Sequence, residues 1–312
     1  MHLPYFKDII EAHKRIKPFI NRTPVVCCDV INKMFGAEIY FKCENLQKVK
    51  AFKYRGATNA VQKLSEKEAA NGVATHSSGN HAAALALAAK TRNIPAYIVM
   101  PTSAPPVKVK NVESYGGIIT YCQPTLEARE EILNKVVEKT GAIFIHPYNN
   151  FDIICGQGTA CVELIEDVDC LDVVIAPVGG GGLLSGTSIT AKHLLPYIQV
   201  IGAEPKNADD AKRSLQAGKI IPAGNPQTIA DGLRTSLGTL TFAVIQKNVN
   251  NIFTATEELI IEAMKILHND ARIMAEPSSA VPLAIILENK SFFVQKRIGI
   301  IISGGNISEN IL

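Results

Sequence analysis

Tryptophan is absent from this chain, and only 6% of its 312 residues are aromatic. No uninterrupted apolar run reaches the roughly 18 residues that a membrane-spanning helix needs. Charge of one sign is also scarce, because the net charge is only +3 and basic clusters such as 48–50 and 108–110 are short. Short clusters of this kind are typical of solvated surfaces, so the sequence argues against a nucleic-acid-binding groove.

The cysteine pattern lacks the features of a disulfide framework or a zinc site. The chain has seven cysteines, none of them in a Cys-x-x-Cys pair, and the adjacent Cys27 and Cys28 are poorly placed for a structural bridge. We therefore expect reduced thiols in a reducing compartment. The first residues are amphipathic and charged, unlike a signal peptide, and together these features predict a cytoplasmic protein.

What is present is an alternation of short apolar strands and helices, which predicts an α/β fold of about two domains. The continuous apolar runs 173–175 and 298–302 are typical of parallel strands that are buried on both faces. A first series of β-α units occupies about 72–149 and forms a small doubly wound lobe. The expected strands are 38–42, 73–75, 96–100, 118–121, 142–146, 173–176, 198–203 and 298–302, and the expected helices include 5–20, 53–64, 125–139, 158–166, 182–193, 208–216, 256–268 and 278–287.

A lysine stands just inside a helix start in the stretch Ala51-Phe52-Lys53-Tyr54-Arg55-Gly56-Ala57. The positive end of the helix dipole and the apolar flank both disfavour the ammonium form of Lys53. The neutral amine is the form that condenses with a carbonyl group. The alternative is an ordinary solvated lysine.

Four glycines, Gly179 to Gly182, follow a buried strand and open a helix. Such a turn directs several backbone N–H groups at one point and predicts a phosphate cradle. The spacing does not fit Gly-x-Gly-x-x-Gly, and Thr187 stands where a P-loop needs lysine. The alternative is a tight structural turn.

Two further turns follow predicted strands. Ser77-Ser78-Gly79-Asn80-His81 predicts a nest for a small anion such as a carboxylate, although Ser77 could instead be a simple N-cap. His76 and His81 lack a third nearby ligand, which argues against a metal site at this turn. Ser303-Gly304-Gly305-Asn306 predicts a third glycine turn, with a plain turn as the alternative.

Taken together and in this order, these stretches resemble the fold-type-II pyridoxal-phosphate enzymes, whose fold is like that of tryptophan synthase β. The resemblance also covers Gly156-Gln157-Gly158-Thr159 and Glu276-Pro277-Ser278-Ser279 and extends over essentially the whole chain. It implies two doubly wound open-sheet domains. Residues 1–71 and 150–312 would form a large coenzyme-binding domain, and 72–149 a small mobile domain that closes over the substrate.

The resemblance also implies roles for individual residues. Lys53 would be the Schiff-base lysine and a general base, and Ser78 the acid/base on the opposite face of Cα. Pyridoxal phosphate would be bound by Phe52, Lys53, Asn80, Gly179, Gly180, Gly181, Gly182, Leu183 and Ser303. Within this set, Asn80 would bond the 3′ oxygen and Ser303 the ring nitrogen. The amino-acid substrate would be bound by Ser77, Ser78, Asn80, His81 and Arg129. For Arg129 the alternative is a surface helix arginine.

Within this group the sequence looks most like serine racemases and the serine/threonine dehydratases, because Ser-Ser-Gly-Asn-His differs from the Thr-Ser-Gly-Asn-Thr typical of cysteine synthases. The implied activity is serine racemisation with dehydration of serine. The alternatives are a serine/threonine or 3-hydroxyaspartate dehydratase, and a sensing module that has lost catalysis. Ala51 and Ala83 depart from the common serine and glutamine, which leaves the substrate preference open.

The racemase-like members also bind a divalent cation and form homodimers, and the same is implied here. The counterparts of their cation ligands are the Glu204 carboxylate, the Ala208 carbonyl and the Asp210 carboxylate. An all-oxygen set suits Mg²⁺, Mn²⁺ or Ca²⁺. The alternative is an acidic helix start whose carboxylates complement the helix dipole.

Overall fold

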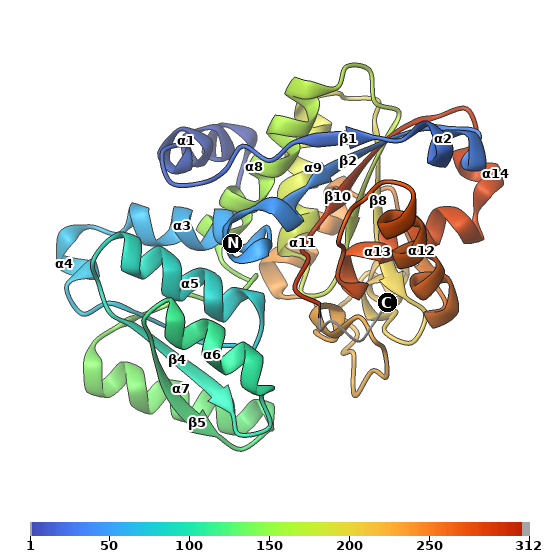
Figure 1. Ribbon diagram of the computed structural model, residues 1–312. Helices are drawn as coiled ribbons and strands as arrows, with labels where there is room; N and C mark the ends of the chain where they lie inside the picture. The colour runs from blue at the N-terminus through green and yellow to red at the C-terminus, as the bar shows by residue number, and fades with distance from the viewer. Residues whose placement is uncertain (1, 308–312) are drawn as a thin grey trace.

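The computed structural model describes residues 2–307, which form two β-sheets covered by helices. Figure 1 shows the smaller, four-stranded lobe at the lower left and the six-stranded lobe to its right. The α/β prediction with two open sheets is therefore confirmed. None of the helices among these residues is long and apolar enough to cross a membrane.

The larger sheet has the strand order β1-β2-β10-β7-β8-β9. All its neighbouring strands pair in parallel except β1, which is antiparallel to β2 at one edge. The central strand β10 is buried on both faces, as its run of isoleucines predicts. The bounds are β1 Val25–Cys27, β2 Glu38–Cys43, β7 Val173–Pro177, β8 Gln199–Pro205, β9 Asn251–Ala255 and β10 Arg297–Ile302.

Helices cover both faces of this sheet. One core packs α2, α12 and α13 against β2, β7, β8 and β10, and a second core packs α8 and α9 on the other face. The helices of this lobe are α1 Phe6–Ile16, α2 Asp29–Phe35, α8 Phe151–Asp167, α9 Gly182–Leu194, α10 Asp210–Ala217, α11 Thr239–Asn248, α12 Glu257–Asn269, α13 Pro277–Glu288 and α14 Lys290–Phe293, with short 3-10 turns η1 Glu44–Leu46, η2 Lys48–Lys50 and η3 Asp231–Leu233.

The smaller sheet has the order β5-β4-β3-β6, and all its pairs are parallel. One face packs against α3 and α5, and the other against α7. The bounds are β3 Val73–His76, β4 Ala96–Pro101, β5 Gly117–Cys122, β6 Ile143–Phe144, α3 Lys53–Lys63, α4 Glu66–Ala69, α5 Asn80–Thr91, α6 Pro106–Ser114 and α7 Leu126–Thr140. All four strands lie inside the segment 72–149, but the division into a large and a mobile small domain stays a prediction.

Two predicted helix boundaries were wrong. The opening helix ends at Ile16 rather than near residue 20. Lys17 still has helical geometry, but Pro18 has no backbone N–H to continue the hydrogen-bond ladder. The helix expected from Gly158 begins at Phe151, where the Asn150 side chain accepts hydrogen bonds from Asp152 N and Ile153 N. The N-cap therefore outweighs the helix-breaking tendency of the glycines that follow.

The sequence prediction also missed β1, α2, α11 and β9. Helix α11 is rich in threonine, valine and isoleucine, which favour strands when considered alone. Its apolar side chains pack against two separate cores, and this tertiary contact outweighs the local preference.

Candidate active site

Lys53 is the first residue of α3, a helix that lies between the two lobes in Figure 1. Its Nζ donates a hydrogen bond to the Pro147 carbonyl at 2.9 Å and lies 5.2 Å from the centroid of the Phe52 ring. Burial lowers the pKa of Lys53 to about 8, while the Glu276 carboxylate acts in the opposite direction. The lowered pKa agrees with the prediction from the sequence and leaves part of the amine neutral near pH 7.

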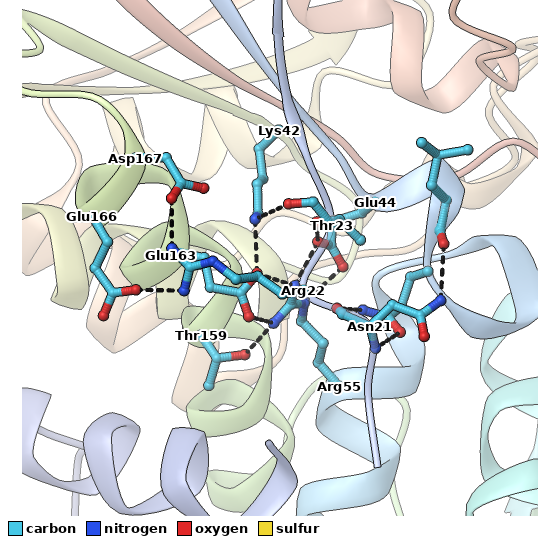
Figure 2. Close-up of polar contacts among 12 residues, drawn as sticks. Asn21, Arg22, Thr23, Lys42, Glu44, Arg55, Thr159, Glu163, Glu166 and Asp167 are labelled. Atoms are coloured by element: carbon cyan, nitrogen blue, oxygen red, sulfur yellow. Dashed lines mark hydrogen bonds and ion pairs between the residues drawn. The ribbon is translucent and has the colours of Figure 1, made fainter. Parts of the chain in front are cut away.

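Arg55 anchors the same helix turn inside the protein, as Figure 2 shows. Its five N–H donors reach Glu44, Glu163 and Thr159 at 2.7–3.2 Å. Lys42 completes this buried cluster with a 2.7 Å ion pair to Glu163, so two cations face two carboxylates. Since residues two apart on a helix point about 200° apart, the anchor on Arg55 turns Lys53 to the opposite side.

The charges within this buried cluster are matched. Burial alone would raise the pKa of Glu163, but the hydrogen bonds and charges of Arg55 and Lys42 outweigh it and lower the pKa. Burial alone would lower the pKa of Arg55, but the charges and hydrogen bonds of Glu44 and Glu163 outweigh it and raise the pKa. These charge-assisted hydrogen bonds hold α3 against α8 and β2.

The glycine turn has the donors that a phosphate group requires. Within residues 2–307, the buried N–H groups from Gly179 to Leu184 donate to no protein acceptor, and they lie at the start of α9. Gly181 has a φ of +86°, and a Cβ on Gly180 would lie 2.2 Å from Tyr148. Buried unpaired N–H groups are costly, so this segment fits an anionic ligand better than a plain turn.

The second turn leads into α5, where Asn80 joins three segments of the chain. Asn80 Nδ2 donates to the Glu276 carboxylate at 2.9 Å, and Asn80 Oδ1 accepts from Asn306 Nδ2 at 2.9 Å. The Asn306 side chain also donates to Val49 O, and its backbone N–H donates to Glu276. Burial raises the pKa of Glu276 to about 7. A second contact of Asn80 Nδ2 with the other Glu276 oxygen measures 3.2 Å, and together these partners fix the orientation of the Asn80 amide.

Ser303 follows β10 at the centre of this arrangement. Its carbonyl accepts from Phe52 N at 2.9 Å, which places the loop before Lys53 beside the end of β10. The Ser303 hydroxyl is 3% exposed and lies 2.8 Å from Ser279 Oγ. The structure thus brings together Phe52, Lys53, Asn80 and Ser303.

The remaining predicted substrate residues differ in their surroundings. Ser77 Oγ accepts from Gly79 N, and within the described part of the chain the Ser78 hydroxyl has no hydrogen-bond partner. His81 is buried beside Ile145 O, and burial holds its pKa well below the usual value, so the ring is neutral. Arg129 lies on α7, and its Nε is buried without a partner among residues 2–307. Burial lowers the pKa of His76, and the charge of Arg129 acts in the same direction. Their substrate roles stay predictions.

The predicted cation ligands lie between the end of β8 and the start of α10. Glu204 accepts hydrogen bonds from Ala211 N and Lys212 N, and Ala208 is buried. Asp210 is 1% exposed, and neither carboxylate oxygen has a protein partner among residues 2–307. Burial raises the pKa of Asp210 to about 7, and burial and Asp210 together raise that of Glu204.

Within the same range, no three His, Cys, Asp or Glu side chains gather into a metal-binding group. The set that we expect contains two carboxylates and one backbone carbonyl, and would not form such a group.

Several residues of this site escaped the sequence analysis. Glu276 and Asn306 were quoted only as parts of motifs, and Pro147 and Tyr148 were not singled out. Their contacts with Lys53, Asn80 and Gly180 join segments far apart in the chain, so no local spacing indicates them. An arginine placed in the first turn of a helix, against the dipole, was a usable signal for the Arg55 cluster.

Comparisons with known proteins agree with this geometry. A family model described as "Pyridoxal-phosphate dependent enzyme" matches residues 16–304. The chain is 52% identical to a β-hydroxyaspartate dehydratase of Paracoccus denitrificans over 98% of both chains. It is 51% identical to a serine racemase of Arabidopsis thaliana over 97% of this chain and 94% of the relative. The solved structure of the Dictyostelium discoideum serine racemase is similar at a TM-score of 0.94 and 51% identity, covering 97% of this chain and 99% of that one.

Proposed function

This chain belongs to the pyridoxal-phosphate-dependent enzymes, and on that basis we propose that it interconverts L- and D-serine and dehydrates serine to pyruvate and ammonia. One observation carries the proposal beyond the family. The site presents a partly neutral Lys53 amine on α3 and an unpaired Ser78 hydroxyl at the start of α5, which gives it two separate proton-transfer groups.

The residues of the site fit the coenzyme. The N–H groups of 179–184, which have no protein acceptor among residues 2–307, would hold its phosphate, and the Asn80 amide would bond its 3′ oxygen. Phe52 would cover the ring, and Ser303 would bond the ring nitrogen. When bound, pyridoxal phosphate supplies the electron sink that makes the Cα proton acidic.

Side chains of the protein then carry out the proton transfers. The Lys53 amine takes the Cα proton from one face, and burial favours the neutral form that can accept it. The Ser78 hydroxyl gives a proton to Cα from the other face, which completes racemisation. Dehydration needs a base on one face only, so Lys53 suffices for it.

Replacing Ser78 by alanine tests this assignment. S78A should reduce racemisation by at least ~100-fold, the usual contribution of a general acid, and retain most of the pyruvate formation. Both products are measured with L-serine as substrate. S77A is the matched control, since losing a substrate-binding hydroxyl should raise KM and leave the ratio of D-serine to pyruvate unchanged. Wild-type racemisation by S78A rules out the role.

A second candidate is a 3-hydroxyaspartate dehydratase without physiological serine racemisation. The observation that favours it is the 52% identity to the β-hydroxyaspartate dehydratase over nearly the whole chain. The two candidates are separated by assaying L-serine, L-threonine and 3-hydroxyaspartate side by side, with and without Mg²⁺. D-Serine formation at a rate comparable to keto-acid formation supports the racemase.

We also propose that Glu204, Asp210 and the Ala208 carbonyl hold a divalent cation such as Mg²⁺. The support is the pair of Asp210 oxygens that are buried without a protein partner. A cation at 100 times its Kd would stabilise the fold by about 2.7 kcal/mol, so a chelator should lower Tm. In D210N the chelator should have no effect. An unchanged wild-type Tm at every chelator concentration contradicts the site.

The remaining proposals concern the whole protein: a cytoplasmic homodimer in which 72–149 moves as a small domain. The dimer follows from the family resemblance, and light scattering on the purified holoenzyme tests it. Domain movement follows from the separate small sheet, and a fall in the radius of gyration on adding substrate would support it.

A further inference from the structure

Beside Ser303, a second buried hydroxyl has no role in the proposed chemistry. Ser279 lies in the first turn of α13 and is fully buried. Its Oγ is 2.8 Å from Ser303 Oγ, accepts from Gly304 N at 2.6 Å and is placed to donate to Gly304 O at 2.8 Å. Gly304 O also accepts from Glu276 N at 3.0 Å. Every hydrogen-bond partner of the Ser279 hydroxyl therefore belongs to the loop that carries Ser303.

Counting protons leaves two arrangements for this pair of hydroxyls, because each serine has a single O–H donor. If Ser279 donates to Gly304 O, its remaining lone pair takes the Ser303 proton, and Ser303 offers only lone pairs to the site. If Ser279 donates to Ser303 Oγ, the Ser303 proton is free for another acceptor. Gly304 O remains satisfied in the second arrangement, because it keeps the Glu276 N–H.

We propose that Ser279 is a positioning residue that donates to Ser303 Oγ and so keeps the Ser303 hydroxyl as a donor to the ring nitrogen of the coenzyme. The inference rests on the coenzyme binding proposed above. In the opposite arrangement the ring nitrogen would have to carry a proton, and its positive charge would be buried beside two neutral hydroxyls. The donor arrangement needs no buried charge. Its cost is the hydrogen bond from Ser279 to Gly304 O, which keeps the Glu276 N–H as a donor.

The consequence is a coenzyme ring that stays unprotonated at nitrogen. An unprotonated ring withdraws electrons less strongly, so the charge on Cα is less delocalised. Rapid reprotonation or loss of a β-substituent is then favoured over transamination. Ser279 would therefore act on the course of the reaction through Ser303, without contact with the substrate.

The test is the state of the ring nitrogen in holoenzyme reconstituted with coenzyme labelled with nitrogen-15 in the ring. We expect the wild-type signal to be that of an unprotonated, hydrogen-bonded nitrogen. In S279A the signal should move toward that of S303A, which lacks the hydroxyl altogether. kcat should fall by up to about tenfold, the effect of one lost hydrogen bond, while KM stays within about twofold.

Ser278 provides the matched control. It precedes Ser279 on the same helix and is equally buried, but its hydroxyl accepts from Gly232 N. S278A should lower Tm and leave the nitrogen signal at its wild-type position. S279T keeps the hydroxyl and should restore the wild-type signal. If S279A cannot be purified folded, S279C serves instead, because a thiol is a weak donor and should produce an intermediate shift.

The outcomes separate this inference from the proposed function. A wild-type nitrogen signal and wild-type kcat in folded S279A overturn the role of Ser279 and leave the racemase proposal intact. A protonated nitrogen in the wild type also overturns it. If the wild type binds no labelled coenzyme at all, the proposed function fails before Ser279 is tested.

Discussion

Lys53 combines two demands at the residue scale, because it must be buried enough to lose its proton and open enough to react. Burial lowers its pKa from 10.5 to about 8. Covalent attachment of the coenzyme to the apoprotein should therefore accelerate as pH rises and level off above about pH 8. Stopped-flow absorbance measures this rate, and an apparent pKa near 10.5 would contradict the assignment. K53M supplies the background without attachment.

The same shift makes a prediction about stability. A lysine with a lowered folded pKa binds fewer protons in the native than in the unfolded state between about pH 8 and 10.5. The stability of the apoprotein should then rise with pH across that window, relative to K53M. Urea unfolding at several pH values measures the difference. If the difference in unfolding free energy between the wild type and K53M did not change with pH, the Lys53 amine would be solvated.

Residue-scale features differed in how far the sequence could predict them. Neighbouring residues in the sequence were enough to predict a role for Lys53, Gly179–Gly182 and Ser77–His81. Glu276 and Asn306 could not be predicted, because their function is to bond each other and Asn80 across long stretches of chain. Such contacts exist only after both sheets have formed.

At the scale of the element, α3 is held by charge as well as by apolar packing. Arg55 faces Glu44 and Glu163 in a setting without solvent, since all three side chains are at most 2% exposed. R55M should destabilise the protein by about 3–5 kcal/mol, because it leaves two buried carboxylates short of partners. R55K should recover only part of the loss, since lysine cannot form two paired hydrogen bonds with each carboxylate. Denaturant unfolding measures both variants.

Arg22 gives a matched control for this prediction. It pairs with Glu166 and Asp167 on the same helix α8, as Figure 2 shows. The Arg22 side chain is, however, 51% exposed. R22Q should cost no more than about 1 kcal/mol. If R22Q and R55M lowered the free energy of unfolding equally, burial of the Arg55 ion pairs could not be what anchors α3.

For helices and strands, the residues at which they begin and end were harder to predict than whether they are present. The strands of both sheets were visible as apolar runs, whereas the start of α8 depended on one asparagine side chain. Helix α11 was missed because its residues favour strands until two cores pack against it. Local propensity therefore predicted the sheets better than the helices that depend on them.

On the scale of the whole molecule, an ion pair joins the segment 72–149 to the larger lobe. Lys108 on α6 forms an ion pair with Asp231 on η3, and both side chains are partly exposed. If closure of 72–149 orders the substrate, K108A should raise KM by no more than about fivefold and leave kcat unchanged, the scale of a surface pair. K110A on the same helix is the control. High salt should bring the wild-type KM toward that of K108A.

Strand β10 lies between β2 and β7, although it is the last strand of the described chain. A ribosome therefore delivers the middle of the large sheet after every flanking strand. Until then β2 and β7 have an unfilled gap between them, and Ser303, the proposed partner of the vitamin-derived ring, has not been made. Loading with the coenzyme must accordingly wait for this strand, and nascent chains stalled before residue 297 should bind none.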